Sequence, residues 1–384
     1  MVLVGGGLQN GLIALAALRA SPDLRIAMIE RADSISGNHT WCFQRRDVPA
    51  SIAPVVDAIT TYRWDGYTVH FPCGQRSIDE PYAGTTSTAL AAAVRAAFAD
   101  SPRRQLMCGV AATDVGANRV ALQTGDTMTA DLVVDARGPD QFPAGGRSAR
   151  GYQKFVGLEL ALARPHRLNR PILMDATVPQ VGGFRFFYVL PLAVDRVLVE
   201  DTTFSRDPSL DLVRLERNCL RFAEDNGFLV ESVIRTETGV LPMPWASVPT
   251  PPRSPLRAGY GGGWFHPATG YSFPIAARLA AFIAGRTPSK VIGPALVNVW
   301  RAHDRQVRFC HRLNKLLFQW FVQGEEWHAL ERFYQLPAAL IARFYALDTT
   351  WMDRARILVG RPPGGFSLRA RLAARDSRPA RQAP

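Results

Sequence analysis

Two adjacent carboxylic acids, Glu200 and Asp201, end an apolar run in the stretch RVLVEDTTF, residues 196–204. A carboxylic acid buried in an apolar cleft keeps its proton at neutral pH, so it can donate that proton to a substrate. Successive side chains of a strand point to opposite faces, so a regular strand offers only one of these acids to a cavity. The residues alone leave two interpretations open: a buried acid catalyst, or two solvated carboxylates at a strand end.

A glycine-rich turn near the start of the chain, GGGLQNG at residues 5–11, could hold the phosphates of a dinucleotide. Gly5 and Gly7 match the first two glycines of the G-x-G-x-x-G fingerprint, which permit a tight turn and close approach of a pyrophosphate. The third glycine position is occupied by Asn10, and Gly11 comes one residue late. A strand before the turn and a helix after it still favour cofactor binding.

The acid expected to select the cofactor is Glu30, which ends the next strand. A carboxylate there can accept hydrogen bonds from a ribose hydroxyl and disfavours a 2′-phosphate, so we expect FAD or NAD rather than NADP. Leu8 and Arg31, which flank the turn and the acid, are expected as further cofactor contacts.

Two later segments also carry features of a cofactor site. The stretch ADLVVDARG (130–138) resembles a strand of FAD proteins of the glutathione-reductase type, and GGGWFHPATGYSFPIAARLA (261–280) is a glycine loop that opens a helix. A helix N-terminus offers free N–H groups to an anionic ligand. Because NAD sites are usually built by one contiguous domain, three separated segments favour FAD. The expected contacts are Val110, Asp135, Gly138, His266, Pro267, Thr269, Gly270 and Tyr271.

Two histidines have alternative interpretations. His266 could touch the cofactor or be a structural histidine. His39, in GNHTWCF (37–43), could line the flavin or substrate site together with neighbouring aromatic residues, or belong to a packed loop.

The composition excludes several classes of protein. Five scattered cysteines form no metal-like cluster and indicate free thiols in a reducing cytoplasm, and no apolar run reaches the ~18 residues of a spanning helix. Met1 leads directly into a strand and turn, so no signal peptide is expected. The net charge is +12, and residues 354–384 hold eight arginines against one acid. This basic tail suits either an anionic membrane surface or solvent, while no motif supports nucleic-acid binding.

The predicted elements give an α/β fold: a glutathione-reductase-type, Rossmann-like FAD domain with an inserted antiparallel β-sheet domain and C-terminal helices. A strand, turn and helix over residues 2–20 and a strand at 24–31 begin the first domain. A hairpin at 184–192 and 196–204, and an amphipathic helix at 211–227, mark the second. A proline-rich loop at 241–255 leads back. The expected boundaries are 1–150 and 255–290 for the FAD domain, 151–254 for the substrate domain, 291–366 for the helices and 367–384 for the basic tail.

Seven motifs in order along nearly the whole chain resemble those of bacterial lycopene β-cyclases. They are VGGGLQNGLIA, GNHTWCF, PILMDATV (171–178), VLVEDTTF, TGVLPM (238–243), HPATGYSFP (266–274) and RARILVG (354–360). The resemblance implies an isomerase that closes the linear ends of lycopene to β-rings, giving β-carotene via γ-carotene. It implies FAD, active in the reduced form, with NAD(P)H as reductant. It also implies a cytoplasmic enzyme of carotenoid biosynthesis, peripherally bound to the bacterial inner membrane, with Glu200 as the essential acid.

The chemistry of ring closure explains why such an enzyme needs a dry acid. Protonation of the terminal alkene creates a cation, the neighbouring alkene captures it, and loss of a proton sets the ring double bond. We expect Glu200 to face the substrate and Asp201, the second candidate catalytic acid, to turn to a polar partner, Arg196 or Arg206. Aromatic faces can stabilise the cation; the candidates are Phe184, Phe186, Tyr188 and Trp264.

Two other functions remain open from the sequence. An FAD-dependent monooxygenase or desaturase of a lipophilic substrate would share the fold and change the product mass. A non-catalytic flavin or lipid carrier would not depend on Glu200. The sequence does not determine the oligomeric state.

Overall fold

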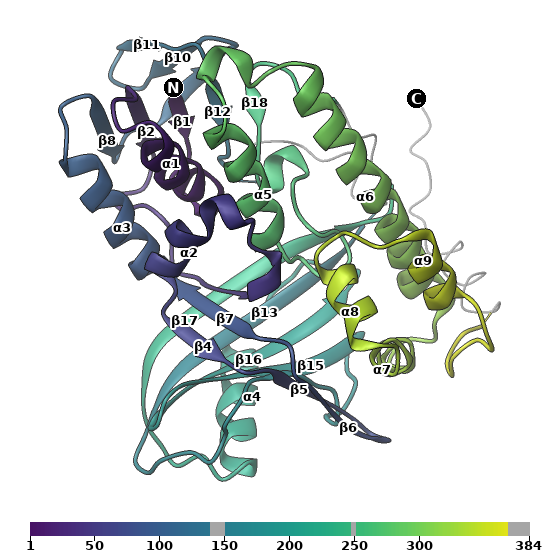
Figure 1. Ribbon diagram of the computed structural model, residues 1–384. Helices are drawn as coiled ribbons and strands as arrows, with labels where there is room; N and C mark the ends of the chain where they lie inside the picture. Colours follow the sequence, from purple (N-terminus) through teal and green to yellow (C-terminus); the bar gives the residue numbers. More distant parts are fainter. Residues whose placement is uncertain (139–149, 247–250, 368–384) are drawn as a thin grey trace, which may run out of the picture.

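A computed structural model describes residues 1–138, 150–246 and 251–367 of the chain. There are two main sheets; in the view of Figure 1 the first lies above the second, and a group of helices flanks both of them. This arrangement confirms the predicted α/β fold class. The basic tail expected at 367–384 lies, except for Ser367, outside the described residues.

The first sheet is parallel, with the strand order β18-β12-β1-β2-β8. Helix α1 (Leu8–Ala20) is buried along most of its length, and α5 (Phe273–Ala284) and α3 (Ser87–Ala99) pack against it. An apolar sequence without a polar stripe suits a helix enclosed in this way. The strands are β1 (Val2–Val4), β2 (Ile26–Glu30), β8 (Arg104–Cys108), β12 (Val133–Asp135) and β18 (Leu256–Arg257). A small antiparallel sheet beside them holds β9 (Ala112–Val115), β10 (Arg119–Leu122) and β11 (Thr127–Thr129).

The second sheet has seven strands in the order β17-β13-β16-β15-β14-β5-β6 and is antiparallel except between β14 and β5. The predicted hairpin forms its centre. Two of its strands, β5 and β6, come from residues expected in the first domain. β17 runs through residues 241–244, which were expected to be loop. The strands are β5 (Tyr67–Phe71), β6 (Gly74–Ile78), β13 (Arg150–Leu162), β14 (Ile172–Asp175), β15 (Phe184–Ala193), β16 (Arg196–Ser205) and β17 (Val230–Pro244).

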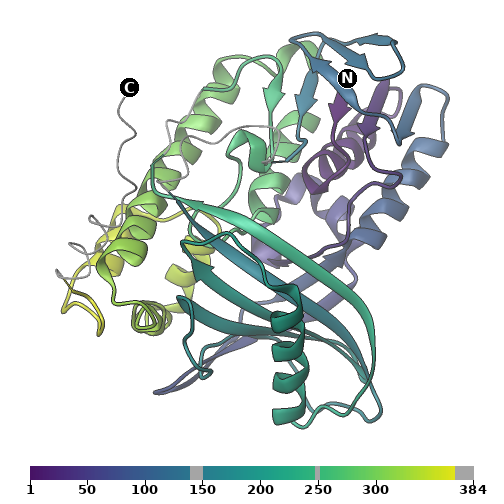
Figure 2. The same cartoon turned by 180° about the vertical axis from the view of Figure 1, so that it is seen from behind.

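Helix α4 (Leu212–Asp225) covers the outer face of the second sheet (Figure 2). Leu215, Cys219 and Phe222 recur at helical spacing on its buried side, and Phe222 stacks on Phe187 of β15 with ring centroids 4.1 Å apart. The other face of the sheet turns toward the first domain (Figure 1). Alternation along β16 therefore determines which residues meet α4 and which face inward.

The remaining elements join the two sheets. Helix α2 (Ala53–Ile59) and a three-stranded sheet of β3 (Thr40–Gln44), β7 (Tyr82–Thr86) and β4 (Tyr62–Trp64) belong to the connecting region. The long helix α6 (Pro294–Trp320) runs from the first domain toward α7 (Trp327–Tyr334), α8 (Ala338–Tyr345) and α9 (Trp351–Leu358), which lie beside one end of the large sheet (Figure 1). Among the residues placed by the structure, no helix combines the length and apolarity needed to cross a bilayer.

Candidate active site

A cavity of about 930 Å³ lies between the two main sheets and is walled by all three regions of the chain. The β1–α1 turn and the loop before α5 line one part of it. The inner face of the seven-stranded sheet and the C-terminal helices line the rest. The cavity thus joins the predicted cofactor residues to the predicted acid.

The β1–α1 turn has the geometry that a phosphate-binding loop requires. Gly5 has φ +94°, and a methyl group there would lie 2.7 Å from the carbonyl oxygen of Ala136. A methyl group on Gly7 would meet nothing within 4 Å, and Gly7 lines the cavity just before α1 begins. Asn10, at the third fingerprint position, donates from Nδ2 to the carbonyls of Val4 and Gly5, at 3.0 and 2.8 Å. The departure from the fingerprint therefore reinforces the turn.

Glu30 is held at the cavity wall by backbone groups. Its Oε2 accepts from the N–H of Gly6 at 2.7 Å, and its Oε1 accepts from the N–H of Ala32 at 2.9 Å. These bonds orient the carboxylate at the end of β2, where a ribose would lie in a dinucleotide-binding fold. Leu8, Arg31 and His39 also line the cavity.

Only some of the cofactor contacts expected in the loop before α5 line the cavity. Thr269, Gly270 and Tyr271 line the cavity, whereas His266 and Pro267 do not. His266 is fully buried: its Nε2 lies 2.9 Å from the carbonyl of Phe344, and its Nδ1 accepts from the N–H of Ala268 at 3.2 Å. Burial lowers the pKa of His266 to about 3, so the ring is neutral. The structural interpretation of His266 therefore holds.

Three other expected contacts also lie away from the cavity, while Gly138 lines it. Asp135 forms an ion pair with Arg137, with both oxygens 2.9 Å from guanidinium nitrogens, and Arg137 is the side chain that reaches the cavity. Gly11 packs against Leu90 of α3, and Val110 packs in the apolar cluster between the first sheet and the small antiparallel sheet. These residues shape the domain without touching the cavity.

Several polar atoms in the cavity wall are buried without a hydrogen-bond partner. They are Gln9 Oε1, Ser36 Oγ, Gln44 Oε1 and Gln153 Oε1. Such groups are costly unless a ligand or water satisfies them. Together with the open space at Gly7 and the anchored Glu30, they fit a large, polar cofactor such as FAD.

Glu200 faces the cavity from the centre of the seven-stranded sheet. Glu200 is 8% exposed, and its Oε1 accepts a hydrogen bond from the Thr202 hydroxyl at 2.6 Å. Burial, and secondarily the negative charge of Glu237, raise the pKa of Glu200 to about 8. A carboxyl group in this position is protonated at neutral pH and can act as a general acid.

Asp201 points to the opposite face, toward α4, and does not line the cavity. Both of its oxygens accept from Arg185, each at 2.8 Å, and Oδ2 also accepts from Asn218 Nδ2 at 2.8 Å. The expected partners were wrong: Arg196 pairs with Glu159, and Arg206 is exposed beyond the strand end. Asp201 is therefore corrected from a candidate catalytic acid to a buried anchor of the strand.

The aromatic residues expected in the wall are mostly there. Phe186, Tyr188 and Trp264 line the cavity, whereas Phe184 is buried behind it. Tyr188 lies opposite Glu200 in the β15–β16 register, and its hydroxyl is 3.1 Å from that of Tyr82. Aromatic side chains therefore line the cavity, and Tyr188 lies beside the acid.

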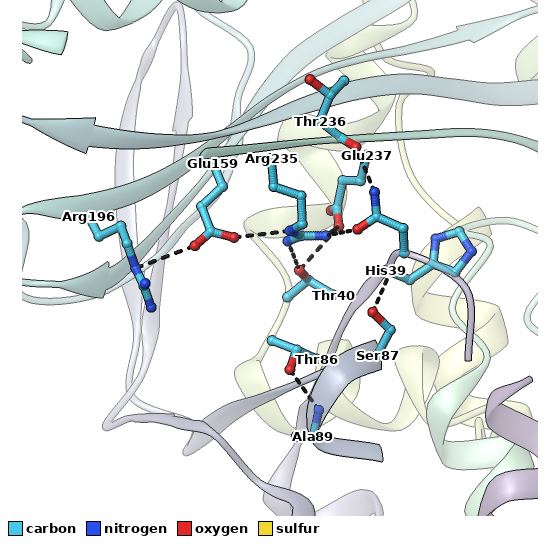
Figure 3. Close-up of polar contacts among 11 residues, drawn as sticks. His39, Thr40, Thr86, Ser87, Ala89, Glu159, Arg196, Arg235, Thr236 and Glu237 are labelled. Carbon is cyan, nitrogen blue, oxygen red and sulfur yellow. Dashed lines mark hydrogen bonds and ion pairs between the residues drawn. The ribbon is translucent and has the colours of Figure 1, made fainter. Parts of the chain in front are cut away.

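A second acid, Glu237 on β17, lines the cavity and was missed by the sequence reasoning. Its Oε2 accepts from Arg235 Nη1 at 2.7 Å and from the Thr40 hydroxyl at 3.2 Å (Figure 3). Arg235 also donates from Nε to Glu159 at 3.0 Å. The alternation of charged residues in RTETG indicates that Arg235 and Glu237 share one face of a strand. Without the pairing of that strand, the sequence does not show which face of the sheet this is.

Comparisons with known proteins agree with this geometry. The family model "Lycopene cyclase protein" matches residues 1–371. Lycopene β-cyclases of Pseudescherichia vulneris and Pantoea ananas are each 37% identical over 373 residues, and that of Paracoccus sp. is 34% identical over 379; each match covers 94% of both chains.

Solved structures share the fold at low identity. A geranylgeranyl bacteriochlorophyll reductase-like protein of Thermoplasma acidophilum has a TM-score of 0.62 and 15% identity, covering 98% of this chain and 95% of its own. A 2-methyl-3-hydroxypyridine-5-carboxylic acid oxygenase has a TM-score of 0.58 and 14% identity, covering 91% of this chain and 97% of its own. The resemblance found in the sequence motifs is thus confirmed, and the chain belongs to the lycopene cyclase family.

Proposed function

We propose that this chain is a lycopene β-cyclase, which closes the linear ends of lycopene to β-rings and yields β-carotene via γ-carotene. The three bacterial relatives carry that name. The observation that carries the proposal is the position of Glu200, a dry carboxyl group in a large, aromatic-lined cavity. Ring closure leaves the molecular formula unchanged, so the reaction is an isomerisation.

In this mechanism Glu200 starts the reaction. Its O–H bond breaks as the proton adds to the terminal alkene, and a carbocation forms on the neighbouring carbon. The hydrogen bond from Thr202 fixes the orientation of the carboxyl group. Burial keeps the proton in place until the substrate arrives, because the charged carboxylate is poorly solvated in the cavity.

The cavity wall stabilises the cation without trapping it. The faces of Phe186 and Tyr188 present the negative side of an aromatic quadrupole, and neither group is a good nucleophile. An apolar wall also excludes water that would capture the cation as an alcohol. Capture by the neighbouring alkene then closes the ring.

FAD is the cofactor that we assign to the polar part of the cavity. Gly5, Gly7 and the start of α1 would hold the pyrophosphate, Glu30 the ribose, and the loop Thr269–Gly270–Tyr271 the flavin half. When bound and reduced by NAD(P)H, FAD would supply an electron-rich ring that can stabilise positive charge on the substrate. The unpartnered oxygens of Gln9 and Gln44 support a polar ligand in this space.

The substrate is expected to enter from a membrane surface. Leu358 at the end of α9 and residues of the segment after it line part of the cavity, and Leu358 is 50% exposed. Trp351 is 77% exposed and Val359 69%, and arginines accompany them in the same segment. Exposed apolar side chains beside arginines suit peripheral binding to an anionic bilayer. We therefore propose a cytoplasmic protein bound peripherally to the bacterial inner membrane.

The test is anaerobic incubation of lycopene with the protein and reduced FAD, followed by measurement of product mass and absorption. A product isomeric with lycopene is expected. A gain of oxygen or a loss of hydrogen would instead identify a monooxygenase or desaturase.

The variant Glu200→Gln should form no ring product while it still binds FAD, because the amide cannot donate the proton. Retained turnover in this variant would refute Glu200 as the donor. Unchanged behaviour in every assay would favour a carrier.

A further inference from the structure

A second carboxylate faces the same cavity as Glu200, and the proposed function assigns it no role. In the sheet register, Gly157 of β13 lies opposite Glu200 of β16 on one side and opposite Glu237 of β17 on the other. All three residues lie on the inner face. The two acids therefore lie in one row across three strands, with a glycine between them.

The absence of a side chain at Gly157 lets the two acids lie close together. A methyl group on Gly157 would lie 3.1 Å from Glu237 Cγ and 3.5 Å from Glu200 Cγ, so the two Cγ atoms are at most about 6.6 Å apart, the sum of these distances. Both acids line the cavity. The two carboxyl groups are therefore close enough for one substrate end to contact both.

The two acids have different charged surroundings. Burial raises the pKa of both groups, but only Glu237 has a guanidinium beside it, which acts in the opposite direction. Arg235 and Thr40 both donate to Glu237 Oε2, whereas Glu200 accepts from a hydroxyl alone (Figure 3). Paired acids whose environments differ in this way commonly divide into an acid and a base.

The groups that face this pair come from several elements. Arg235 is also bound to Glu159 of β13 and to Asn38 Oδ1, at 3.0 and 2.9 Å. Cys42 of β3 and Tyr188 of β15 line the same part of the cavity, and His39 lies next to Thr40. Among these neighbours, Arg235 is the cation in contact with a cavity acid.

We propose that Glu237 is the general base that removes a proton from the cyclised cation, an inference that rests on the proposed function. The ring C–H bond breaks, its electron pair becomes the second bond of the ring double bond, and the proton passes to the Glu237 carboxylate. Glu200 has by then lost its own proton to the substrate. Transfer of a proton from Glu237 back to Glu200 restores the starting state, so no oxidant or reductant is consumed.

The experiment compares wild type, Glu237→Gln and the matched control Glu159→Gln. Glu159 contacts the same arginine as Glu237 but does not line the cavity. Each protein is incubated anaerobically with lycopene and reduced FAD, and the products are separated and their ring double bonds located by NMR. We expect E237Q to lose about 10²-fold or more in turnover, the contribution of a positioned base. Its residual product should carry displaced ring double bonds or an added hydroxyl, and E159Q should form β-rings alone.

Each outcome has a defined meaning. Wild-type turnover with β-rings alone in E237Q would overturn the base assignment and leave the proposed function intact. Failure of the wild type to form any ring would overturn the proposed function itself. If E237Q does not fold, Glu237→Asp decides: withdrawal of the carboxylate by one methylene should lower turnover at least tenfold, and an undiminished rate would refute the proposal.

Discussion

The buried ion pair between Arg185 and Asp201 provides a sharp test of how the active-site strand is held. Asp201 is fully buried, and Arg185 contacts both of its oxygens at 2.8 Å. The variant Arg185→Met removes the cation and leaves the carboxylate on the α4 side with Asn218 as its remaining side-chain donor. A buried charge without its counter-charge is among the most destabilising changes that a single substitution can make.

The expected magnitude follows from this burial. Removal of one partner of a buried ion pair costs about 3–5 kcal/mol of unfolding free energy. The entropy of unfolding at the midpoint is roughly 0.8 kcal/mol/K for a 384-residue chain that unfolds as one unit. The melting temperature of R185M should therefore fall by about 4–6 °C. The control Arg206→Met changes an exposed arginine that was the expected partner, and it should alter stability by less than about 0.5 kcal/mol.

The assay is urea unfolding followed by tryptophan fluorescence, with cyclisation measured on the folded fraction. The double variant R185M/D201N removes both charges, so we expect it to be more stable than R185M alone. Because Asp201 does not line the cavity, the double variant should still form β-rings.

Two results would refute this reasoning. If R185M lost less than about 1 kcal/mol of unfolding free energy, the Asp201 carboxylate would not need the arginine to remain buried. A folded, flavin-bound double variant as inactive as Glu200→Gln would mean that Asp201 takes part in the chemistry.

Three further predictions concern the acid, the cofactor turn and helix α9. Because Glu200 must be protonated to act and its pKa is raised to about 8, turnover should fall as the pH rises through that value in a pH–rate profile; a loss of turnover with rising pH that is centred near pH 4.5 would contradict this. Gly5→Ala should lower both the melting temperature and the flavin content, because the positive φ of Gly5 and the nearby Ala136 carbonyl leave no room for a methyl group. Gly7→Ala should lower the flavin content alone. An equal fall in melting temperature in both variants would contradict the assigned geometry. Trp351→Glu should weaken co-sedimentation with anionic phosphatidylglycerol vesicles without changing the melting temperature, because this side chain is 77% exposed, and unchanged sedimentation would count against membrane binding through α9.

The parts of the fold that the sequence predicted are those with a local signal. The strand–turn–helix at residues 2–20 and the hairpin of β15 and β16 have clear periodicity and turn residues. β17 was not predicted, and the prolines at 242 and 244 led to the prediction of a loop at its end. These prolines lie near the end of β17, which pairs along its length with β13 and is an edge strand of the sheet, where proline is tolerated.

In the candidate site, the direction of side chains along one strand was predicted, whereas contacts between different strands were not. The alternation of a strand was enough to separate Glu200 from Asp201. The partner of Asp201 was not predictable in this way, because Arg185 reaches it through the register of the hairpin. Glu237 was missed for the same reason: its importance depends on Gly157 and on the pairing of β17 with β13. Contacts between residues distant in the chain carry no local signal in a single sequence.

The glycine between the two acids has a consequence for how the enzyme could be changed. Gly157 places only peptide backbone between the two acids, and that backbone is paired to a strand on each side. A side chain can swing to another rotamer, but a doubly paired strand cannot step aside. The separation of the two backbones that carry the acids is therefore fixed by two spacings of about 4.8 Å between neighbouring strands. A variant designed to place the ring double bond elsewhere should therefore change the length of the acidic side chains, because the paired strands that carry them cannot move apart.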